Sequence, residues 1–285
     1  MTAPSAPSAP SATPATPATP DVPPETEAQR NDPEFVTALA RGFAVLRCFR
    51  RGEKTLGNKD MAQRTGLPRS TIARLTHTLT ELGYLEFHPD IEKYSLGLAV
   101  LNFSAQYLGG LDVREVARPL MQALANEVGA TVTLAAPQSE HMVFLEVAHG
   151  NRTFALRVGV GERVPRGTTA VGRACMAAAP LDERPDRLED FKRLTTEATW
   201  PRVRADFLHA FADFDAHGLC LSLGDWNKDV HAVSVPIVSI DGRKVMAFSA
   251  TLPARQAGRE QLLHEIGPKL IEMRDRVVRA LGGRL

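Results

Sequence analysis

The stretch that decides the fold of this chain is Gly66-Leu67-Pro68-Arg69-Ser70-Thr71-Ile72-Ala73-Arg74-Leu75, set within a longer segment from Asn58 to Leu96. The residues from Asn58 to Thr65 predict a short helix that stops at Gly66, because glycine tolerates the left-handed backbone of a sharp turn. Pro68 suits the start of a second helix, since its fixed φ fits the first turn and its missing N–H is not needed there. The spacing therefore predicts two helices joined by a sharp turn.

The second helix has one apolar side and one polar side. Apolar residues recur at spacings of three and four, which predicts a buried stripe made of Ile72, Leu75, Leu79 and Leu82. At about 100° per residue, the opposite face holds Ser70, Ala73, Arg74, His77 and Glu81, with Arg69 beside it. Short polar and guanidinium side chains near a helix N-terminus suit the reading of a DNA major groove. The stretch therefore predicts a helix-turn-helix, against the alternative of an ordinary solvated helix face.

The residues expected to contact DNA are Lys59, Arg69, Ser70, Thr71, Arg74, His77 and Lys93. Arg74 is the best candidate for a base edge, whereas Arg69 could read guanine or hold a phosphate. Thr71 projects toward the buried flank, which favours phosphate contact or helix capping over base reading. Lys59, at the start of the preceding helix, is a candidate for phosphate contact.

The sequence on either side predicts a winged helix-turn-helix over residues 35–96. A first helix from Phe35 to Phe49 is expected to pack on the other two through Val36, Leu39, Phe43, Leu46 and Phe49. Downstream, Tyr84 to Phe87 and Lys93 to Leu96 predict a hairpin around His88-Pro89-Asp90. Basic residues outnumber acidic ones across this module, as expected for a surface that contacts phosphates. Asp90 and Glu92 beside Lys93 argue against deep phosphate contact by the hairpin tip.

Length and composition favour about two ordinary domains of roughly 150 residues each. The chain has 285 residues, of which 44% are hydrophobic and 24% charged, so cores of ordinary size can form. The net charge of +1 does not by itself indicate nucleic-acid binding. Repeats of Ala, Pro, Ser and Thr predict a disordered leader over residues 1–34, with a proline-rich docking peptide as the alternative.

A linker helix is predicted over residues 97–111, and a larger domain over residues 112–285. The linker places Leu98, Leu101, Tyr107 and Leu108 on an apolar side that needs a partner, and a second copy of the chain is the simplest one. The larger domain begins with a helix at Asp112 and is predicted to be an α+β, sensor-like domain with an antiparallel sheet. Its expected strands are Thr131 to Leu134, Met142 to Val147, Phe154 to Val158, Leu219 to Leu223, His231 to Ser239 and Arg243 to Leu252. Its expected helices are Thr168 to Ala178, Pro201 to His217 and Gln256 to Leu281, and Asp241-Gly242 is expected to form a tight hairpin turn.

Cysteines and other reactive residues show no catalytic or metal-binding pattern. Cys48, Cys175 and Cys220 are far apart in apolar surroundings, which predicts buried, inert thiols. The four histidines His141, His149, His217 and His231 are scattered, so each is expected to be structural or on the surface. No apolar run is long enough to span a membrane and no signal peptide is evident, so a cytoplasmic protein without catalytic residues, metal or cofactor is expected.

From about Leu39 to Leu281 the sequence resembles the IclR family of bacterial transcription regulators. In the first half the resemblance is carried by Met61 to Thr71, Glu81-Leu82-Gly83-Tyr84-Leu85 and Tyr94-Ser95-Leu96-Gly97. In the second half it is carried by Thr169-Ala170-Val171-Gly172-Arg173-Ala174 and Ala232-Val233-Ser234-Val235-Pro236-Ile237. The resemblance implies a dimer, or a dimer of dimers, that binds operator DNA as a repressor or activator. It also implies a GAF-like domain that holds a small effector, often a carboxylate or an aromatic acid.

The resemblance further implies an effector pocket made of Leu156, Val164, Ala170, Val171, Ser222, Asp225, Val230, Ser249 and Thr251. Backbone groups at Ala170 and Val171 and the hydroxyls of Ser249 and Thr251 would supply donors for a carboxylate. Family members that bind small 2-oxo acids have an acidic residue at the position of Ser222. Such members can also have a cysteine at the position of Ala232. These two differences leave the identity of the ligand open. Two alternatives also stay open. Hydroxyls on a sheet often bond the neighbouring backbone, and Asp225 could instead begin a turn.

Three functions are compatible with these patterns. The first is a DNA-binding regulator that an organic acid controls through the linker helix. The second is a hydrolase-like enzyme with an accessory helix-turn-helix, which lacks support because no nucleophile motif is present. The third is a constitutive DNA-binding dimer without an effector.

Overall fold

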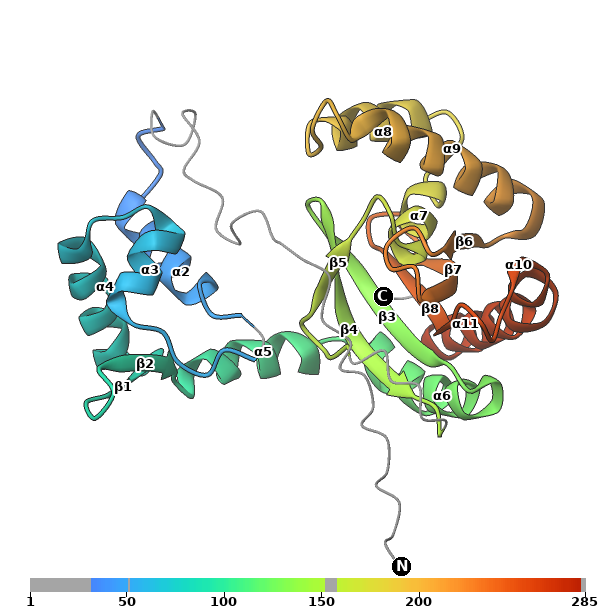
Figure 1. Ribbon diagram of the computed structural model, residues 1–285. Helices are drawn as coiled ribbons and strands as arrows, with labels where there is room; N and C mark the ends of the chain where they lie inside the picture. The colour runs from blue at the N-terminus through green and yellow to red at the C-terminus, as the bar shows by residue number, and fades with distance from the viewer. Residues whose placement is uncertain (1–31, 51, 152–157, 283–285) are drawn as a thin grey trace, which may run out of the picture. The chain divides into compact units, whose positions relative to one another are not determined.

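The computed structural model describes residues 32–50, 52–151 and 158–282 of the chain. The chain divides into two compact units between Tyr107 and Leu108 (Figure 1), and each is described by itself. Residues 1–31 of the predicted leader, most of the strand predicted from Phe154 and the pocket candidate Leu156 lie outside the described residues.

The N-terminal unit is a winged helix-turn-helix, as the sequence predicts. Its helices are α2 (Thr37–Arg47), α3 (Asn58–Thr65), α4 (Arg69–Glu81) and α5 (Ala99–Gly109), and its wing is the antiparallel pair β1 (Leu85–His88) and β2 (Lys93–Leu96). Gly66 ends α3 with φ of 71°, in the left-handed region, and Pro68 directly precedes α4. The turn therefore forms at the two residues whose backbone preferences predict it.

Two expectations about packing in this unit are wrong. Val36, Leu39 and Phe43 are each at least half exposed, because α2 turns its other side, with Val45 and Cys48, into the core. The helix is apolar on two sides, so spacing alone does not choose between them. Leu82 is also exposed, because α4 ends at Glu81 and the chain turns away. The side chain of Thr76 is buried in place of an apolar residue, and its hydroxyl donates a hydrogen bond to the Ile72 carbonyl.

The wing joins α5 through a close backbone approach at Gly97. A Cβ atom at this position would lie 2.1 Å from the Gly83 carbonyl oxygen, and the Gly97 N–H donates to the Tyr84 carbonyl at 2.8 Å. Just beyond it, the rings of Tyr84 and Phe103 stack with centroids 5.8 Å apart. The Tyr-Ser-Leu-Gly motif therefore needs glycine at this position because there is no room for a side chain, and not because of an unusual φ.

Replacing Gly97 with alanine is expected to destabilise the N-terminal unit by about 1–3 kcal/mol, because backbone must move to admit the methyl group. Gly109→Ala is the matched control at the other end of α5, where nothing lies within 4 Å of an added Cβ. Urea denaturation followed by circular dichroism measures both. Equal stabilities of the two variants would contradict the close approach at Gly97.

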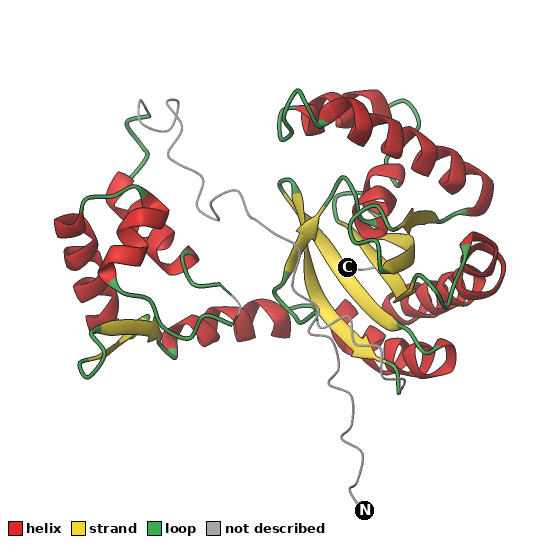
Figure 2. Ribbon diagram, in the orientation of Figure 1, coloured by secondary structure: helices red, strands yellow, loops and turns green. Residues whose placement is uncertain are grey.

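The C-terminal unit is an antiparallel sheet with helices on both faces. Its helices are α6 (Asp112–Val128), α7 (Ala170–Ala177), α8 (Arg184–Lys192), α9 (Trp200–His217), α10 (Arg259–Gln261) and α11 (Gly267–Leu281). Its strands are β3 (Thr131–Gln138), β4 (His141–His149), β5 (Arg163–Pro165), β6 (Cys220–Leu223), β7 (Val230–Val238) and β8 (Val245–Pro253). The strand order is β5-β4-β3-β8-β7-β6, with every neighbouring pair antiparallel. Figure 2 shows helices, in red, on both sides of these strands, in yellow.

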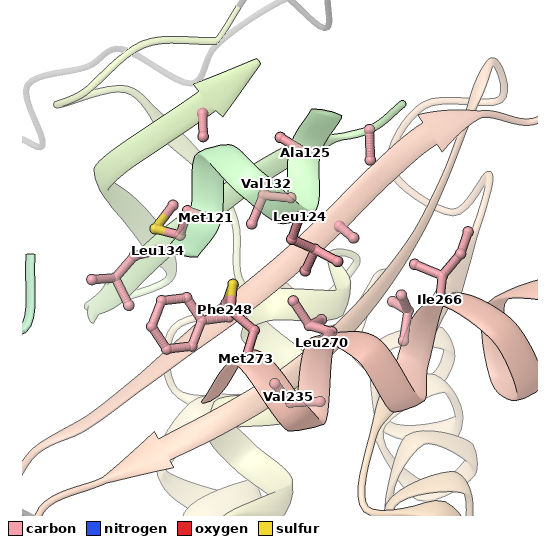
Figure 3. Close-up of a cluster of buried hydrophobic side chains, with 14 of the residues drawn as sticks. Met121, Leu124, Ala125, Val132, Leu134, Val235, Phe248, Ile266, Leu270 and Met273 are labelled. Atoms are coloured by element: carbon pink, nitrogen blue, oxygen red, sulfur yellow. The ribbon is translucent and has the colours of Figure 1, made fainter. Parts of the chain in front are cut away.

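Two apolar cores hold the layers together. One face of the sheet packs on α6 and α11, where Met121 and Leu124 of α6 meet Phe248 of the sheet and Leu270 of α11 (Figure 3). The other face packs on α7, α8 and α9, through side chains such as Phe191 and Phe207. All six apolar positions predicted for the last helix are buried, namely Leu262, Leu263, Ile266, Leu270, Met273 and Val277.

Several boundaries in this unit differ from the prediction. The closing helical segment begins at Arg259 instead of Gln256 and contains a π-helical turn, Leu262–Ile266. Helix α8 was not expected, since it is mostly polar and buries few apolar residues. Strand β5 is too short to give a recognisable pattern of alternating apolar residues. Around Asp241-Gly242 the strand pairing stops at Val238 and Val245, so the loop is wider than a two-residue turn. Within the described ranges, no helix is both long and apolar enough to cross a bilayer.

Candidate functional site

The predicted DNA-reading face is formed by α4 and its surroundings. Arg69, Ser70, Arg74 and His77 are exposed, whereas Thr71 is half-buried on the flank, as its projection predicts. Lys59 on α3 and Lys93 on the wing are also exposed. Among the described residues, no ion pair holds the guanidinium groups of Arg69 and Arg74, so both are available to an external anion.

Arg64 on α3 has a structural role in the same unit, because its guanidinium is held by contacts within the protein. Its guanidinium donates to Glu53 Oε1 at 2.7 Å and to the Cys48 carbonyl at 2.6 Å. The hydrogen bond from Arg64 lowers the pKa of Glu53 below its usual value. Arg64 therefore braces the helices and is a structural residue rather than a candidate for DNA contact.

The effector-pocket candidates converge on one cavity in the C-terminal unit. Its volume is about 390 Å³, which includes space open to solvent. The lining residues are Thr133, Phe144, Val164, Thr169, Ala170, Val171, Ser222, Trp226, Val230, Ala232, Ser249 and Thr251. The structure thus brings together seven predicted residues from β5, α7, β6, β7 and β8: Val164, Ala170, Val171, Ser222, Val230, Ser249 and Thr251.

Four lining residues were not predicted: Thr133, Phe144, Thr169 and Trp226. Thr133 and Phe144 lie on strands whose sequence reads as ordinary core. Trp226 lies in the β6–β7 connection, where the only signal was an aromatic residue beside turn formers. Their position in the cavity depends on how distant strands align, which no local pattern records.

Donors surround the cavity without any formal charge. The lining side chains are apolar or hydroxylic, apart from the indole of Trp226, so none of them is ionised. Ala170 and Val171, the first two residues of α7, line the cavity. No side chain caps the start of this helix, and the hydroxyl of Thr169, at the N-cap position, donates to the Pro165 carbonyl at 2.6 Å. Uncapped N–H groups and the helix dipole favour an anion at this end of a helix.

A close approach fixes the start of α7. A Cβ atom at Gly172 would lie 1.9 Å from the Arg166 carbonyl oxygen, so only glycine lets this turn of helix sit against the preceding loop. Arg173, the next residue, is 5% exposed and ties α7 to β6 by a hydrogen bond to the Leu221 carbonyl. The Thr169-to-Ala174 motif therefore has a steric reason at Gly172 and an electrostatic one at Arg173.

Asp225 lies outside the cavity lining and binds Arg173 instead. Arg173 Nη1 donates to Asp225 Oδ2 at 2.7 Å and to the Leu221 carbonyl at 2.8 Å, and its Nη2 lies 3.1 Å from Asp206 Oδ2. Burial acts to raise the pKa of Asp225, but the hydrogen bond and charge of Arg173 outweigh it and hold that pKa below its usual value. Asp225 thus fixes the loop that carries Trp226.

Neither a metal centre nor a reactive thiol is apparent in the described parts of the chain. No group of His, Cys, Asp and Glu side chains has the arrangement of a metal site there. Cys48, Cys175 and Cys220 are all buried, as predicted, and burial raises the pKa of Cys175 to about 12. Burial also raises the pKa of the Cys220 thiol.

Native protein is expected to resist a water-soluble thiol reagent at pH 8. With a pKa of about 12, only about one Cys175 thiol in ten thousand is ionised at that pH, and the thiolate is the reactive form. Labelling followed by mass spectrometry should show slow reaction at Cys175 and Cys220 until denaturant is added. Rapid labelling of either residue in folded protein would support the enzyme alternative.

Comparison with known proteins gives matches over both units. Residues 38–89 match the IclR helix-turn-helix domain, and residues 105–279 match the bacterial transcriptional regulator IclR C-terminal domain. The chain is 30% identical over 249 residues to the HTH-type transcriptional regulator TsaQ1/TsaQ2 of Comamonas testosteroni, covering 87% of this chain and 89% of that protein. It is 24% identical to the p-hydroxybenzoate hydroxylase transcriptional activator of Acinetobacter baylyi, covering 87% of this chain and 92% of that protein.

The fold also matches a solved structure. An IclR family transcriptional regulator from Brucella abortus is 42% identical, with a TM-score of 0.76, and the match covers 93% of this chain and 100% of that one.

Proposed function

The chain belongs to the IclR family of DNA-binding transcriptional regulators, and we propose that an aromatic monocarboxylate, bound in the cavity at α7, controls its affinity for operator DNA. The observation that carries this proposal is the chemistry of the cavity lining. Hydroxyls and uncapped N–H groups supply donors for one anionic group, while Phe144, Val164, Val230 and Trp226 supply apolar walls.

The aromatic class of effector has support among the similar proteins. A relative whose name refers to p-hydroxybenzoate hydroxylase adds weight to the aromatic class.

We propose that DNA contact falls to side chains on and around α4. They are the exposed residues Lys59, Arg69, Ser70, Arg74, His77 and Lys93 and the half-buried Thr71. Two copies of the chain would place two such faces in successive major grooves, about 34 Å apart. The exposed apolar side chains of α5 and the residue before it, among them Leu98, Leu101 and Tyr107, supply the surface for a second copy. Since α5 directly precedes α6, a ligand that shifts the C-terminal unit can change the spacing of the two faces.

The test is a fluorescence anisotropy titration of the full-length protein against DNA from upstream of its own gene, at two salt concentrations. Benzoate, 4-hydroxybenzoate and phenylacetate form the effector panel. Salt-sensitive, sequence-selective binding that one acid shifts is expected. Selective binding that no acid shifts would favour the constitutive alternative, and the absence of selective binding would contradict the proposed reading face.

A further inference from the structure

We propose that Thr133 is a ligand-binding residue of the cavity, and that its hydroxyl and that of Thr251 hold a single carboxylate at the middle of the sheet. The inference rests on the proposed function, since it requires an organic acid in the cavity. It adds a binding residue that no motif in the chain marks, and it predicts selection of monocarboxylates over dicarboxylates.

The hydroxyls that line the cavity fall into two groups. Three of them donate to backbone carbonyls: Thr169 to Pro165 at 2.6 Å, Ser222 to Thr168 at 2.9 Å and Ser249 to Val233 at 3.0 Å. The hydroxyls of Thr133 and Thr251 have no hydrogen-bond partner among the described residues. Only this second pair keeps its proton free to donate to a ligand.

The two residues are buried, but their hydroxyl oxygens remain open to the cavity. Thr133 is 1% exposed and Thr251 is 7% exposed, and both line the cavity. Neither hydroxyl oxygen belongs to the buried polar atoms that lack a partner in the described part of the chain, so each keeps contact with the space inside the cavity. A carboxylate in that space can accept from both hydroxyls, and hydrogen bonds to an ionised acceptor are stronger than those to a neutral one.

Sheet register places the two hydroxyls close enough to share one carboxylate. Thr133 on β3 lies opposite Ser249 on β8, and Thr251 follows Ser249 by two residues on the same face. Diagonal neighbours of this kind are about 7–8 Å apart at the backbone, with side chains somewhat closer. Two hydrogen bonds of about 2.7 Å to the two oxygens of one carboxylate fit this separation.

Along the sheet, the neighbours of this pair on either side are apolar. In the strand order, Val164 and Phe144 lie on one side of Thr133, on β5 and β4, while Val230 and Ala232 lie beyond Thr251, on β7. A second carboxylate on the ligand would be pressed against one of these apolar groups without a cationic partner. The cavity therefore suits one carboxylate and an uncharged body.

The matched variants are Thr133→Val and Thr131→Val. Valine keeps the shape of threonine and removes the hydroxyl, and Thr131 lies two residues away on the same strand and face but does not line the cavity. Without ligand, Thr133→Val should melt close to the temperature of the wild type, since it keeps the shape of the side chain and breaks no hydrogen bond between described residues. Thr133→Ser, which keeps the hydroxyl, should retain ligand binding.

Calorimetric titration of the full-length protein measures binding of benzoate, 4-hydroxybenzoate, phenylacetate, the dicarboxylate phthalate and the neutral benzamide. We expect at least one monocarboxylate to bind the wild type and Thr131→Val alike, and Thr133→Val to bind it roughly 10- to 100-fold more weakly. Phthalate and benzamide should bind more weakly than the best monocarboxylate.

Each failure is distinguishable. If the wild type binds no acid in the panel, the proposed effector class falls. If the wild type binds an acid and Thr133→Val binds it as well as Thr131→Val does, the effector class stands and the role of Thr133 is overturned. Phthalate binding as tight as the best monocarboxylate would overturn the single-charge claim.

Discussion

Replacing Arg74 with alanine is expected to weaken operator binding by about 1–3 kcal/mol, roughly 5- to 150-fold. Arg74 lies on the exposed face of α4 and its guanidinium has no ion-pair partner among the described residues, so it can approach DNA without first breaking a protein contact. Because the side chain is exposed, its loss should change the stability of the N-terminal unit by no more than about 0.5 kcal/mol.

The form of the loss tells base contact from phosphate contact. If Arg74 reads a guanine, Arg74→Ala relaxes selectivity at one position of the operator while binding to unrelated DNA changes little. If it holds a phosphate, affinity falls evenly for all DNA sequences. The slope of the logarithm of affinity against the logarithm of salt concentration then becomes smaller in magnitude by about one. The matched control is Arg193→Ala, an exposed arginine of the C-terminal unit, which should bind like the wild type. Unchanged affinity in Arg74→Ala would contradict the assignment of the reading face.

Replacing Arg173 with methionine is expected to destabilise the C-terminal unit by about 3 kcal/mol. Arg173 is 5% exposed and is the shared partner of Asp206 and Asp225, so its loss leaves two partly buried carboxylates without this cation. Breaking a buried pair by removing one member costs about 3–5 kcal/mol, and the lower end applies because both carboxylates keep some contact with solvent.

Arg187→Met is the matched control, because Arg187 pairs with Glu183 on the exposed side of α8 and such surface pairs contribute about 0–1 kcal/mol. Urea denaturation at pH 7 measures both variants, and equal midpoints would contradict the role of Arg173.

A pH series adds an independent readout. The folded pKa of Asp225 is lowered, so its contribution is present above the unfolded value near 4 and is lost as pH falls through the folded pKa. The difference in free energy of unfolding between the wild type and Arg173→Met should therefore become smaller at acidic pH.

The parts of the fold that could be predicted are those fixed by local chemistry. Gly66 and Pro68 determine a turn and a helix start within a few residues, and the closing helical segment has one strongly periodic apolar side. Helix α2 shows the limit of this reasoning. It has apolar residues on two sides, and only contact with α3 and α4 decides that Val45 and Cys48 are buried while Val36 and Phe43 are not.

The cavity could be predicted only in part, because it is assembled by strand register. Ala170 and Val171 are neighbours at a helix start, so a motif can mark them. Thr133 reaches the cavity because β3 pairs with β8, more than a hundred residues later in the chain. For Asp225, sequence position correctly indicates the neighbourhood of the cavity, but the side chain turns to Arg173, which hydropathy patterns do not register.

Binding of the effector and binding of operator DNA are expected to be coupled in this protein, and calorimetry tests this coupling most directly. The dissociation constant of the tightest-binding monocarboxylate is measured on full-length protein with and without saturating operator DNA. Binding at two coupled sites is reciprocal, so operator must change effector affinity by the same factor by which effector changes operator affinity, about 5- to 150-fold. Equal effector affinities with and without operator would contradict the account, even if each ligand binds tightly on its own.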